Sequence, residues 1–270
     1  MPPSLAEIVD NKRLEVAALK AALPEWASQT APNGDGRFLR SLQPEKINLI
    51  CELKPRSPSL GHLKEASNLA ETVAAYRKHA DCLSVLTDNK YFGGSMALLK
   101  EMSRSLALPL LCKDFIVDRL QCLQARHHGA DAVLLIVKIL NDEELSVLHE
   151  SITDLGMNAV VEIQNERELE RALAVNPQIL LINNRDLSTF EIDFATSERL
   201  APRIPSGPVV ISASGISSRA EIQRLLPYAH NFLIGSALML SDNLEQLLQE
   251  LKAAPSEDGR TALPRMVADA

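Results

Sequence analysis

The sequence has no long hydrophobic run, and aromatic residues make up only 4% of its 270 residues. No apolar segment approaches the roughly 20 residues that a membrane-spanning helix needs. The first residues, Met-Pro-Pro-Ser, form neither the charged region nor the apolar region of a secretory leader. We therefore expect a soluble protein that stays in the cytoplasm and has no membrane partner.

Positive charge is also scarce. Lys and Arg number 28 against 35 Asp and Glu, which gives a formal net charge of -7. This balance argues against general binding to nucleic acid or acidic membranes, although a local basic pocket can still bind a phosphate ester. Any anionic ligand must therefore be held by a few placed side chains.

Cysteine and histidine do not form the spacings typical of disulfides or metal sites. None of the four cysteines belongs to a C-x-x-C pair, so we expect reduced thiols. His127 and His128 lie at the end of a predicted helix, and no other His or Cys has ligand spacing to them. We expect no metal site. The cysteines are Cys51, Cys82, Cys112 and Cys122.

The apolar content of 46% is enough for one large core. Short, β-rich apolar runs alternate with segments whose apolar residues have helical spacing, which predicts a parallel sheet covered by helices. Eight repeats favour an α/β fold of the closed (β/α)8 TIM barrel type, with an open doubly wound sheet as the lesser alternative. The predicted strands are residues 47–54, 82–87, 108–113, 132–137, 159–163, 179–183, 209–212 and 232–235. The predicted helices between them include residues 66–79, 119–128, 142–155, 166–174 and 218–226.

We expect the chain to divide into three parts. Residues 1–46 form an extra N-terminal helical segment, with an amphipathic helix at 4–22 and a shorter one at 38–42, and this segment caps one end of the barrel. Residues 47–252 form the catalytic barrel. The polar stretch that follows predicts a mobile tail at 253–270.

Polar and charged side chains follow the predicted strands. Alternation along the first strand sends Glu52 and Lys54 to the same face, where an acid and a base project together. One such residue alone is usually a solvated rim charge, but the joint pattern predicts a catalytic pocket at the carboxyl ends of the strands. An acid and amines in one pocket shift each other's pKa values. The residues at strand ends are Glu52, Lys54, Lys113, Lys138, Glu162, Asn183, Ser212 and Ser214.

A second cluster predicts a phosphate site. Ser214-Gly215-Ile216 follows the seventh strand and Ile234-Gly235-Ser236 the eighth, where barrels commonly bind phosphate with loop amides. Ser57 and Ser59 can add hydroxyl donors. By contrast, Gly93-Gly94-Ser95 lacks the Lys and the spacing of a Walker sequence, and we interpret it as a turn that starts a helix.

Four apolar residues near strand ends, Phe92, Phe115, Leu134 and Leu187, can line a slot for an aromatic ring. Packing in the core explains each of them equally well. The pocket around them decides between these interpretations.

With these motifs in place, the chain resembles the indole-3-glycerol-phosphate synthase family of tryptophan biosynthesis over about residues 5–251. This resemblance implies a carboxy-lyase that closes the indole ring of 1-(2-carboxyphenylamino)-1-deoxyribulose 5-phosphate, with loss of CO2 and water and no cofactor. It implies a small phosphorylated substrate and a monomer or weak homo-oligomer. The runs that carry it are residues 52–61, 84–95, 111–118, 129–136, 183–187 and 232–236.

The resemblance also implies roles for individual residues. Lys113 would be the general acid at the ketone oxygen, and Lys54 would hold the substrate carboxylate and assist proton transfers. Glu162 would act in dehydration, with Glu52 as a neighbouring acid or base, and Asn183 would orient the substrate hydroxyls. Further substrate contacts would come from Arg185, Ser214, Phe92, Phe115, Leu134 and Leu187, and phosphate contacts from Ser57, Gly215, Gly235 and Ser236.

The chain departs from the family at four positions. Ala213 stands where the family normally has Glu, and Leu181 where it usually has Gly. Leu181 should point into the barrel, and because the two strands are neighbours, we infer that these changes are coupled. Two lesser departures are Pro55 after Lys54, and Leu60 where a basic residue is common.

Three hypotheses about function remain open. The first is the synthase. The second, motivated by Ala213, is a paralogue with an altered substrate, or a catalytically weak or idle barrel that binds a sugar phosphate. The third is a sugar-phosphate isomerase on the same fold. Cys51 beside Glu52 is the one feature that supports this hypothesis.

Overall fold

The computed structural model describes residues 3–22, 24–28, 34–44, 46–54, 56–57, 61–62 and 69–253, with the backbone alone for 28, 56–57 and 61–62. The tail predicted for 253–270 lies almost wholly outside this range, as do Pro55, Ser59 and Leu60. Within the described part, no helix combines the length and the apolar character needed to cross a membrane.

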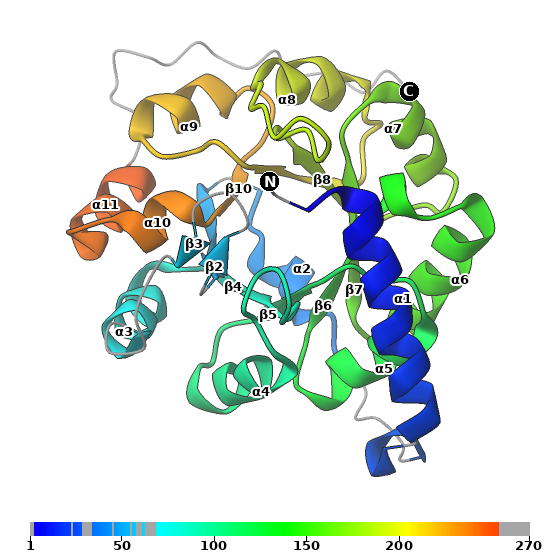
Figure 1. Ribbon diagram of the computed structural model, residues 1–270. Coiled ribbons are helices and arrows are strands. Elements are labelled where there is room, and N and C mark those ends of the chain that lie inside the picture. The colour runs from blue at the N-terminus through cyan, green and yellow to red at the C-terminus, as the bar shows by residue number, and fades with distance from the viewer. Residues whose placement is uncertain are drawn as a thin grey trace.

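Eight parallel strands close into a barrel in the order β1-β10-β9-β8-β7-β6-β5-β4 (Figure 1). The predicted TIM barrel is confirmed, and every predicted strand overlaps an observed one. A two-stranded antiparallel pair, β2 (Arg56–Ser57) and β3 (Gly61–His62), follows β1 and was not predicted. The barrel strands are β1 (Asn48–Leu53), β4 (Cys82–Leu86), β5 (Leu110–Lys113), β6 (Ala132–Ile136), β7 (Asn158–Ile163), β8 (Ile179–Asn183), β9 (Val209–Ala213) and β10 (Asn231–Ile234).

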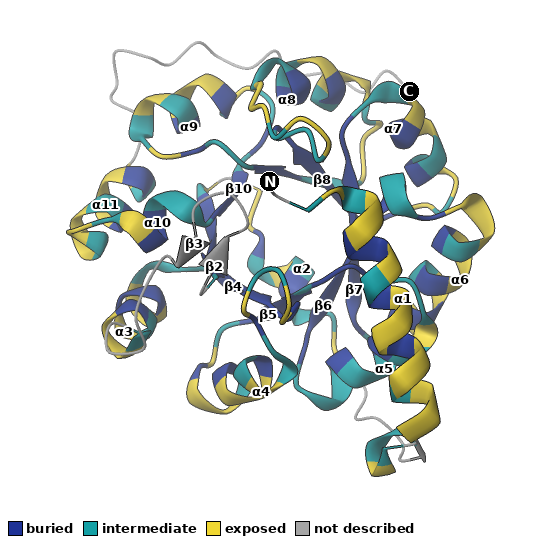
Figure 2. Cartoon of the chain, in the orientation of Figure 1, coloured by how far each residue is buried: buried dark blue, intermediate teal, exposed yellow. Residues whose placement is uncertain are grey.

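Nearly all strand residues are buried because one face of each strand fills the barrel and the other packs on the helices (Figure 2). The interior cluster contains Ile50, Leu134, Leu181 and Ala213, so the inward direction predicted for Leu181 is confirmed. A larger outer cluster lies between strands and helices. All four cysteines are free and buried.

The helices around the barrel begin with side-chain caps that the sequence supplies locally. Asp118 and Asn141 form capping boxes with Gln121 and Glu144, which satisfy the free N–H groups of the first turn. Ser95 caps the helix after Gly93-Gly94, as predicted. The helices are α3 (Leu69–His79), α4 (Met96–Ser105), α5 (Arg119–His127), α6 (Asp142–Asp154), α7 (Glu166–Leu173), α8 (Ala195–Leu200), α9 (Arg219–Leu225), α10 (Ser236–Leu240) and α11 (Leu244–Lys252), with 3-10 turns η1 (Glu25–Ser28), η3 (Val137–Ile139) and η4 (Ala201–Arg203).

The N-terminal segment contacts both ends of the barrel rather than one. Helix α1 (Leu5–Ala22) lies over loops at the carboxyl end, where Lys20 pairs with Asp118 at 2.5 Å (Figure 1). Helix α2 (Arg37–Ser41) closes the amino end. There Arg37 forms two hydrogen bonds of 2.8 Å to Asp131, which directly precedes β6, and the wholly buried Phe38 joins the interior cluster.

Candidate active site at the carboxyl ends of the strands

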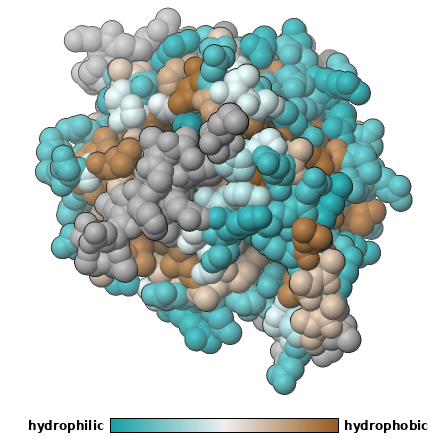
Figure 3. All heavy atoms as spheres, in the orientation of Figure 1, coloured by the Kyte–Doolittle hydropathy of each residue, from teal (hydrophilic) through white to brown (hydrophobic). Residues whose placement is uncertain are grey.

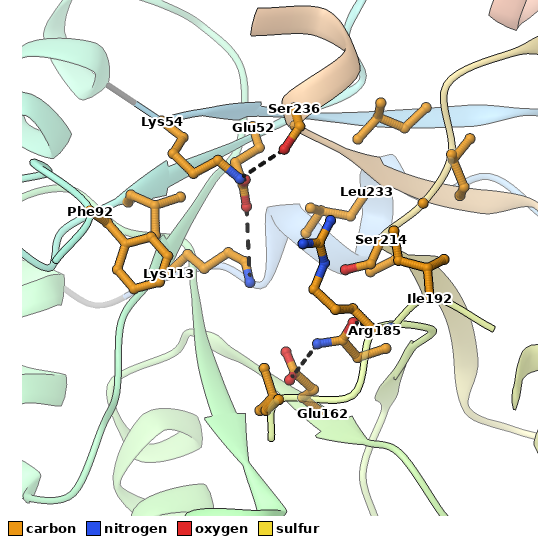
Figure 4. A pocket seen from close by; sticks show the side chains of 18 of the residues that line it. Glu52, Lys54, Phe92, Lys113, Glu162, Arg185, Ile192, Ser214, Leu233 and Ser236 are labelled. Carbon is orange, nitrogen blue, oxygen red and sulfur yellow. Dashed lines mark hydrogen bonds and ion pairs between the residues drawn. The ribbon is translucent and has the colours of Figure 1, made fainter. Parts of the chain in front are cut away.

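A cavity of about 390 Å³ opens at the carboxyl ends of the strands (Figure 4). Its volume suits a small molecule. The structure brings together in its lining almost all of the site residues named from the sequence, which are Glu52, Lys54, Phe92, Lys113, Phe115, Leu134, Glu162, Asn183, Arg185, Leu187, Ser214, Gly215, Gly235 and Ser236. Ser57 lies in β2, whose side chains are outside the described part.

Two lysines face one buried carboxylate. Glu52 is second from the end of β1, and alternation places it on the same side as Lys54, as predicted, with 2.9 Å between Nζ and Oε1. Lys113, at the end of β5, lies 3.9 Å from Oε2 (Figure 4). Burial raises the pKa of Glu52, but attraction to Lys54 and Lys113, with a smaller effect from Arg185, outweighs it and holds that pKa below its ordinary value. Glu52 is therefore an anion that orients two cations.

The opposite wall holds the second carboxylate. Glu162 on β7 is 2% exposed and accepts a 2.9 Å hydrogen bond from the Asn183 side chain on β8. The side-chain oxygen of Asn183 accepts the backbone N–H of Arg185 at 3.0 Å. Because Asn183 bonds on both sides, it fixes the orientation of Glu162 and the start of the loop that carries Arg185, whose side chain points into the cavity (Figure 4).

The loops after the last two strands form a third wall. Ser214 and Gly215 have φ angles of 70° and 85°, the left-handed region that a glycine adopts without strain. Lys54 donates a 3.4 Å hydrogen bond to the hydroxyl of Ser236. A Cβ on Gly235 would lie 2.3 Å from Oε1 of Glu52, so this glycine makes room for the carboxylate.

An apolar side completes the cavity. The rings of Phe92 and Phe115 pack with centroids 5.9 Å apart, and Leu134 and Leu187 line the same space. All four residues therefore border the cavity, as the aromatic slot required. Ala213 also lines it, between Asn183 of β8 and Leu233 of β10 in register.

Sequence reasoning missed the apolar mouth of the cavity. Among the described residues, the exposed large hydrophobic side chains include Ile192 and Leu240, and both line the cavity. Phe190, with a φ of 62°, lies in the same loop as Ile192. The molecular face that carries α1 is otherwise a mixture of hydrophilic and isolated hydrophobic areas (Figure 3). An apolar residue in a loop gives no periodic signal, so no pattern marked these positions.

Three residues considered from the sequence do not join the cavity lining. Lys138 binds Ser188 at 3.0 Å on the rim. Ser212 is fully buried on the outer face of the barrel wall, where its hydroxyl lies 2.8 Å from that of Ser197. Cys51 is buried in the outer cluster, and burial raises the pKa of its thiol well above the ordinary value. Cys51 was the feature that kept the isomerase hypothesis open, and it does not line the cavity.

The closed barrel and the mixed set of acids and bases at its carboxyl end define the class, a TIM-barrel protein with a small-molecule cavity at the carboxyl ends of its strands. Within that class, the chain belongs to the indole-3-glycerol phosphate synthase family, whose sequence pattern it matches over residues 5–251.

Curated relatives have two different lengths. The chain is 41% identical to the tryptophan biosynthesis protein TrpCF of Vibrio parahaemolyticus, a match that covers 93% of the chain but 53% of the relative. The chain therefore spans about half the length of such relatives. It is 38% identical to the indole-3-glycerol phosphate synthase of Streptococcus pneumoniae strain CGSP14, which covers 92% of the chain and 96% of the relative.

Solved structures support the fold. The tryptophan synthase a2b2 complex from Pyrococcus furiosus contains a chain with a TM-score of 0.59 and 17% identity, over 77% of this chain and 99% of that one. At this identity the likeness concerns the fold alone.

Proposed function

We propose that the protein closes the indole ring of 1-(2-carboxyphenylamino)-1-deoxyribulose 5-phosphate to give indole-3-glycerol phosphate. The observation that carries the proposal is the pairing of Lys54 and Lys113 with one ionised Glu52, opposite the Glu162–Asn183 pair, in a cavity with an apolar side. Cations and carboxylates placed in this way match the charges that develop when an aromatic carbon attacks a ketone. Family membership supports the same reaction.

The first step forms a carbon–carbon bond between the ring carbon that bears the carboxylate and the ketone carbon. Negative charge develops on the ketone oxygen, and Lys113 donates a proton to it. The ring becomes positive, and the carboxylates of Glu52 and Glu162 stabilise that charge. Lys54 holds the substrate carboxylate until CO2 leaves, and the electron pair of the broken bond restores the aromatic ring.

Loss of water completes the product. An acid protonates the new hydroxyl as it departs, and a base removes the proton from the carbon next to nitrogen, so that a double bond forms. Glu162 acts in this step, and the hydrogen bond from Asn183 that holds its carboxylate at the cavity wall supports this role. Each step forms or breaks a bond within the substrate or transfers a proton, and none changes the overall redox state, so the proposed reaction requires no cofactor.

The remaining walls suit the two ends of the substrate. Phe92, Phe115, Leu134 and Leu187 accommodate the aromatic ring. The backbone at Gly215, Gly235 and Ser236, with Ser57 from the following hairpin, accommodates the phosphate. Arg185, Ser214 and Asn183 contact the hydroxylated chain between them.

Turnover of the purified protein tests the proposal. Incubation with the carboxyphenylamino substrate should produce indole fluorescence, and Lys113→Ala should lower kcat by about 10²- to 10⁴-fold, the usual contribution of a general acid. Asn176→Ala, far from the cavity lining, is the control. No fluorescence at high enzyme concentration would contradict the proposal and favour the idle barrel that Ala213 suggests.

We also propose that the protein works in the cytoplasm as a monomer or weak homo-oligomer. Light scattering after size-exclusion chromatography measures the mass in solution. A dimer that persists at nanomolar concentration would contradict the proposal of a monomer or weak homo-oligomer.

A further inference from the structure

Helix α1 contributes a buried cation to the carboxyl end of the barrel. Lys12 is 3% exposed although lysine is almost never fully buried without partners. Its ammonium lies 3.0 Å from the carboxylate of Asp88, 2.9 Å from that of Asp114 and 2.7 Å from that of Glu15. Asp88 and Asp114 are themselves buried at the ends of β4 and β5. One ammonium therefore joins the ends of two neighbouring strands.

Each of these two carboxylates holds one of the aromatic residues of the cavity. Asp88 accepts the backbone N–H of Tyr91 at 2.8 Å and of Phe92 at 3.2 Å. Asp114 accepts the backbone N–H of Phe115 at 2.8 Å and the hydroxyl of Thr87 at 2.6 Å. The positions of both rings thus depend on two carboxylates that form ion pairs with Lys12, which lies outside the cavity lining.

The same contact lies next to the general acid. Asp114 directly follows Lys113 in the chain, and the backbone oxygen of Lys113 accepts the N–H of Thr87 at 3.1 Å. If Lys12 were absent, two adjoining carboxylates would remain buried, and their repulsion would drive the ends of β4 and β5 apart or draw Lys113 toward Asp114. Either change moves Lys113 away from Glu52.

Electrostatics agree with this arrangement. Burial opposes the charge on Lys12, but Asp114, Glu15 and Asp88 together raise the pKa of its ammonium above the ordinary value. The single ammonium is shared by three carboxylates. At Asp114 its attraction therefore offsets only part of the effect of burial, and the pKa of Asp114 is raised. Lys12 remains charged throughout the neutral range, as a permanent counterion must.

We infer that Lys12 is a positioning residue for the cavity, which acts through Asp88 and Asp114 on Lys113, Phe92 and Phe115. The inference rests on the proposed function for its kinetic consequence. Helix α1 thereby belongs to the machinery of the site, although Lys12 itself is not part of the cavity lining.

Docking of α1 does not depend on Lys12 alone. Lys20 pairs with Asp118, the Tyr91 hydroxyl donates to the backbone oxygen of Glu7 at 3.3 Å, and Ile8 packs into the interior cluster. A substitution at Lys12 should therefore leave the helix bound. This separates an effect on position from a loss of fold.

Five variants, including Asp114→Asn with and without Lys12→Met, test the inference by steady-state kinetics on protein shown to be folded by circular dichroism. Lys12→Met should lower kcat at least about tenfold, since displacement by 1 Å can cost 10²-fold, and raise KM through the aromatic wall. Lys12→Arg, which keeps the charge, should recover most of kcat. Lys20→Met is the matched control because it removes another α1 ion pair without touching the cavity. In an Asp114→Asn background, Lys12→Met should cost less, since one of the two carboxylates is already neutral.

The outcomes separate this inference from the proposed function. If the native protein turns over and Lys12→Met keeps its kcat within about twofold, the inference is wrong and the function stands. If the native protein is inactive, the proposed function is wrong, and a crystal structure of Lys12→Met decides the inference instead. Displacement of Lys113 and Phe92 from their native positions supports it, and unchanged positions overturn it.

Discussion

At the scale of single residues, the cavity depends on small side chains as much as on charged ones. Gly235 is an example, since a methyl group there would lie 2.3 Å from Oε1 of Glu52. Its φ angle of -123° lies outside the left-handed region that favours glycine, so the reason for this glycine that the structure shows is the space that the carboxylate occupies. Sequence reasoning assigned Gly235 to phosphate, and the structure adds this second reason.

Gly235→Ala should therefore reduce kcat/KM about tenfold or more, because Glu52 must move and the contacts to Lys54 and Lys113 change. Turnover measured at several substrate concentrations checks this. Combining it with Glu52→Ala provides the control, since little further loss is expected once the carboxylate is gone. Full additivity of the two losses would show that Gly235 acts by another route.

The residues of the site could be predicted to different degrees. Alternation along one strand was enough to place Glu52 beside Lys54, because the period of a strand is fixed. The mouth residues Phe190 and Ile192 were out of reach, since a loop has no such period. Lys12 was missed for another reason: its two buried partners lie 76 and 102 positions away in the chain, and its partner close in sequence is an exposed glutamate that gives no sign of burial.

At the scale of elements, neighbouring strands β8 and β9 carry the two main departures from the family, Leu181 and Ala213. Leu181 pairs in register with Ile211, while Ala213 pairs with Asn183 one layer higher. Leu181 is fully buried and Ala213 is 3% exposed, both in the interior cluster. They are therefore diagonal neighbours on adjacent strands within one apolar cluster, as a coupled pair requires.

Ala213→Glu should lower the melting temperature and reduce turnover, because it adds a third carboxylate to a buried cavity wall that already holds Glu162, where Leu181 limits the space. Adding Leu181→Gly should recover part of the turnover by opening that space. Thermal unfolding and kinetics of both single variants and the double variant measure the coupling. Simple addition of the two effects would mean that the positions changed independently.

Prediction of the elements succeeded where a segment had its own period or cap. Strand β8 was predicted to the residue, and α5 and α6 within one residue at each end, because the apolar residues of both helices recur at helical spacing. The pair β2–β3 was missed. Each of its strands has two residues, too few for an alternation to be recognised.

At the scale of the whole molecule, the buried Lys12 predicts a dependence of stability on pH. The pKa of Lys12 is raised on folding, so its contribution is complete below the ordinary value of 10.5 and is lost as pH rises through the higher folded value. Lys12→Met should lower the unfolding free energy by about 3 kcal/mol at neutral pH, the usual cost of breaking a buried pair. The difference should stay constant from pH 7 to about 9 and narrow only above pH 10.5.

Urea unfolding of the two proteins across this range measures the difference. Lys20→Met is again the reference, since its exposed pair should contribute well under about 1 kcal/mol. A difference that already narrowed between pH 7 and 9 would show that Lys12 is not held as a cation.

The overall architecture was the most predictable part. Eight apolar runs and short connections leave few topologies other than a closed barrel, and closure follows from pairing β1 with β10. The course of the N-terminal segment was not predictable. An amphipathic pattern predicts that a helix packs against the rest of the protein, but it does not predict the position. The segment reaches both ends of the barrel through α1 and α2.

That course has a consequence for the growing polypeptide on the ribosome. The backbone N–H of Gly34 bonds to the oxygen of Leu155, and that of Leu39 to the side chain of Asn158, so this segment lacks its partners until more than half of the chain has been translated. An isolated 18-residue helix is marginal in water. This segment is therefore synthesised before its partners, and it reaches its final place only after β7 has emerged.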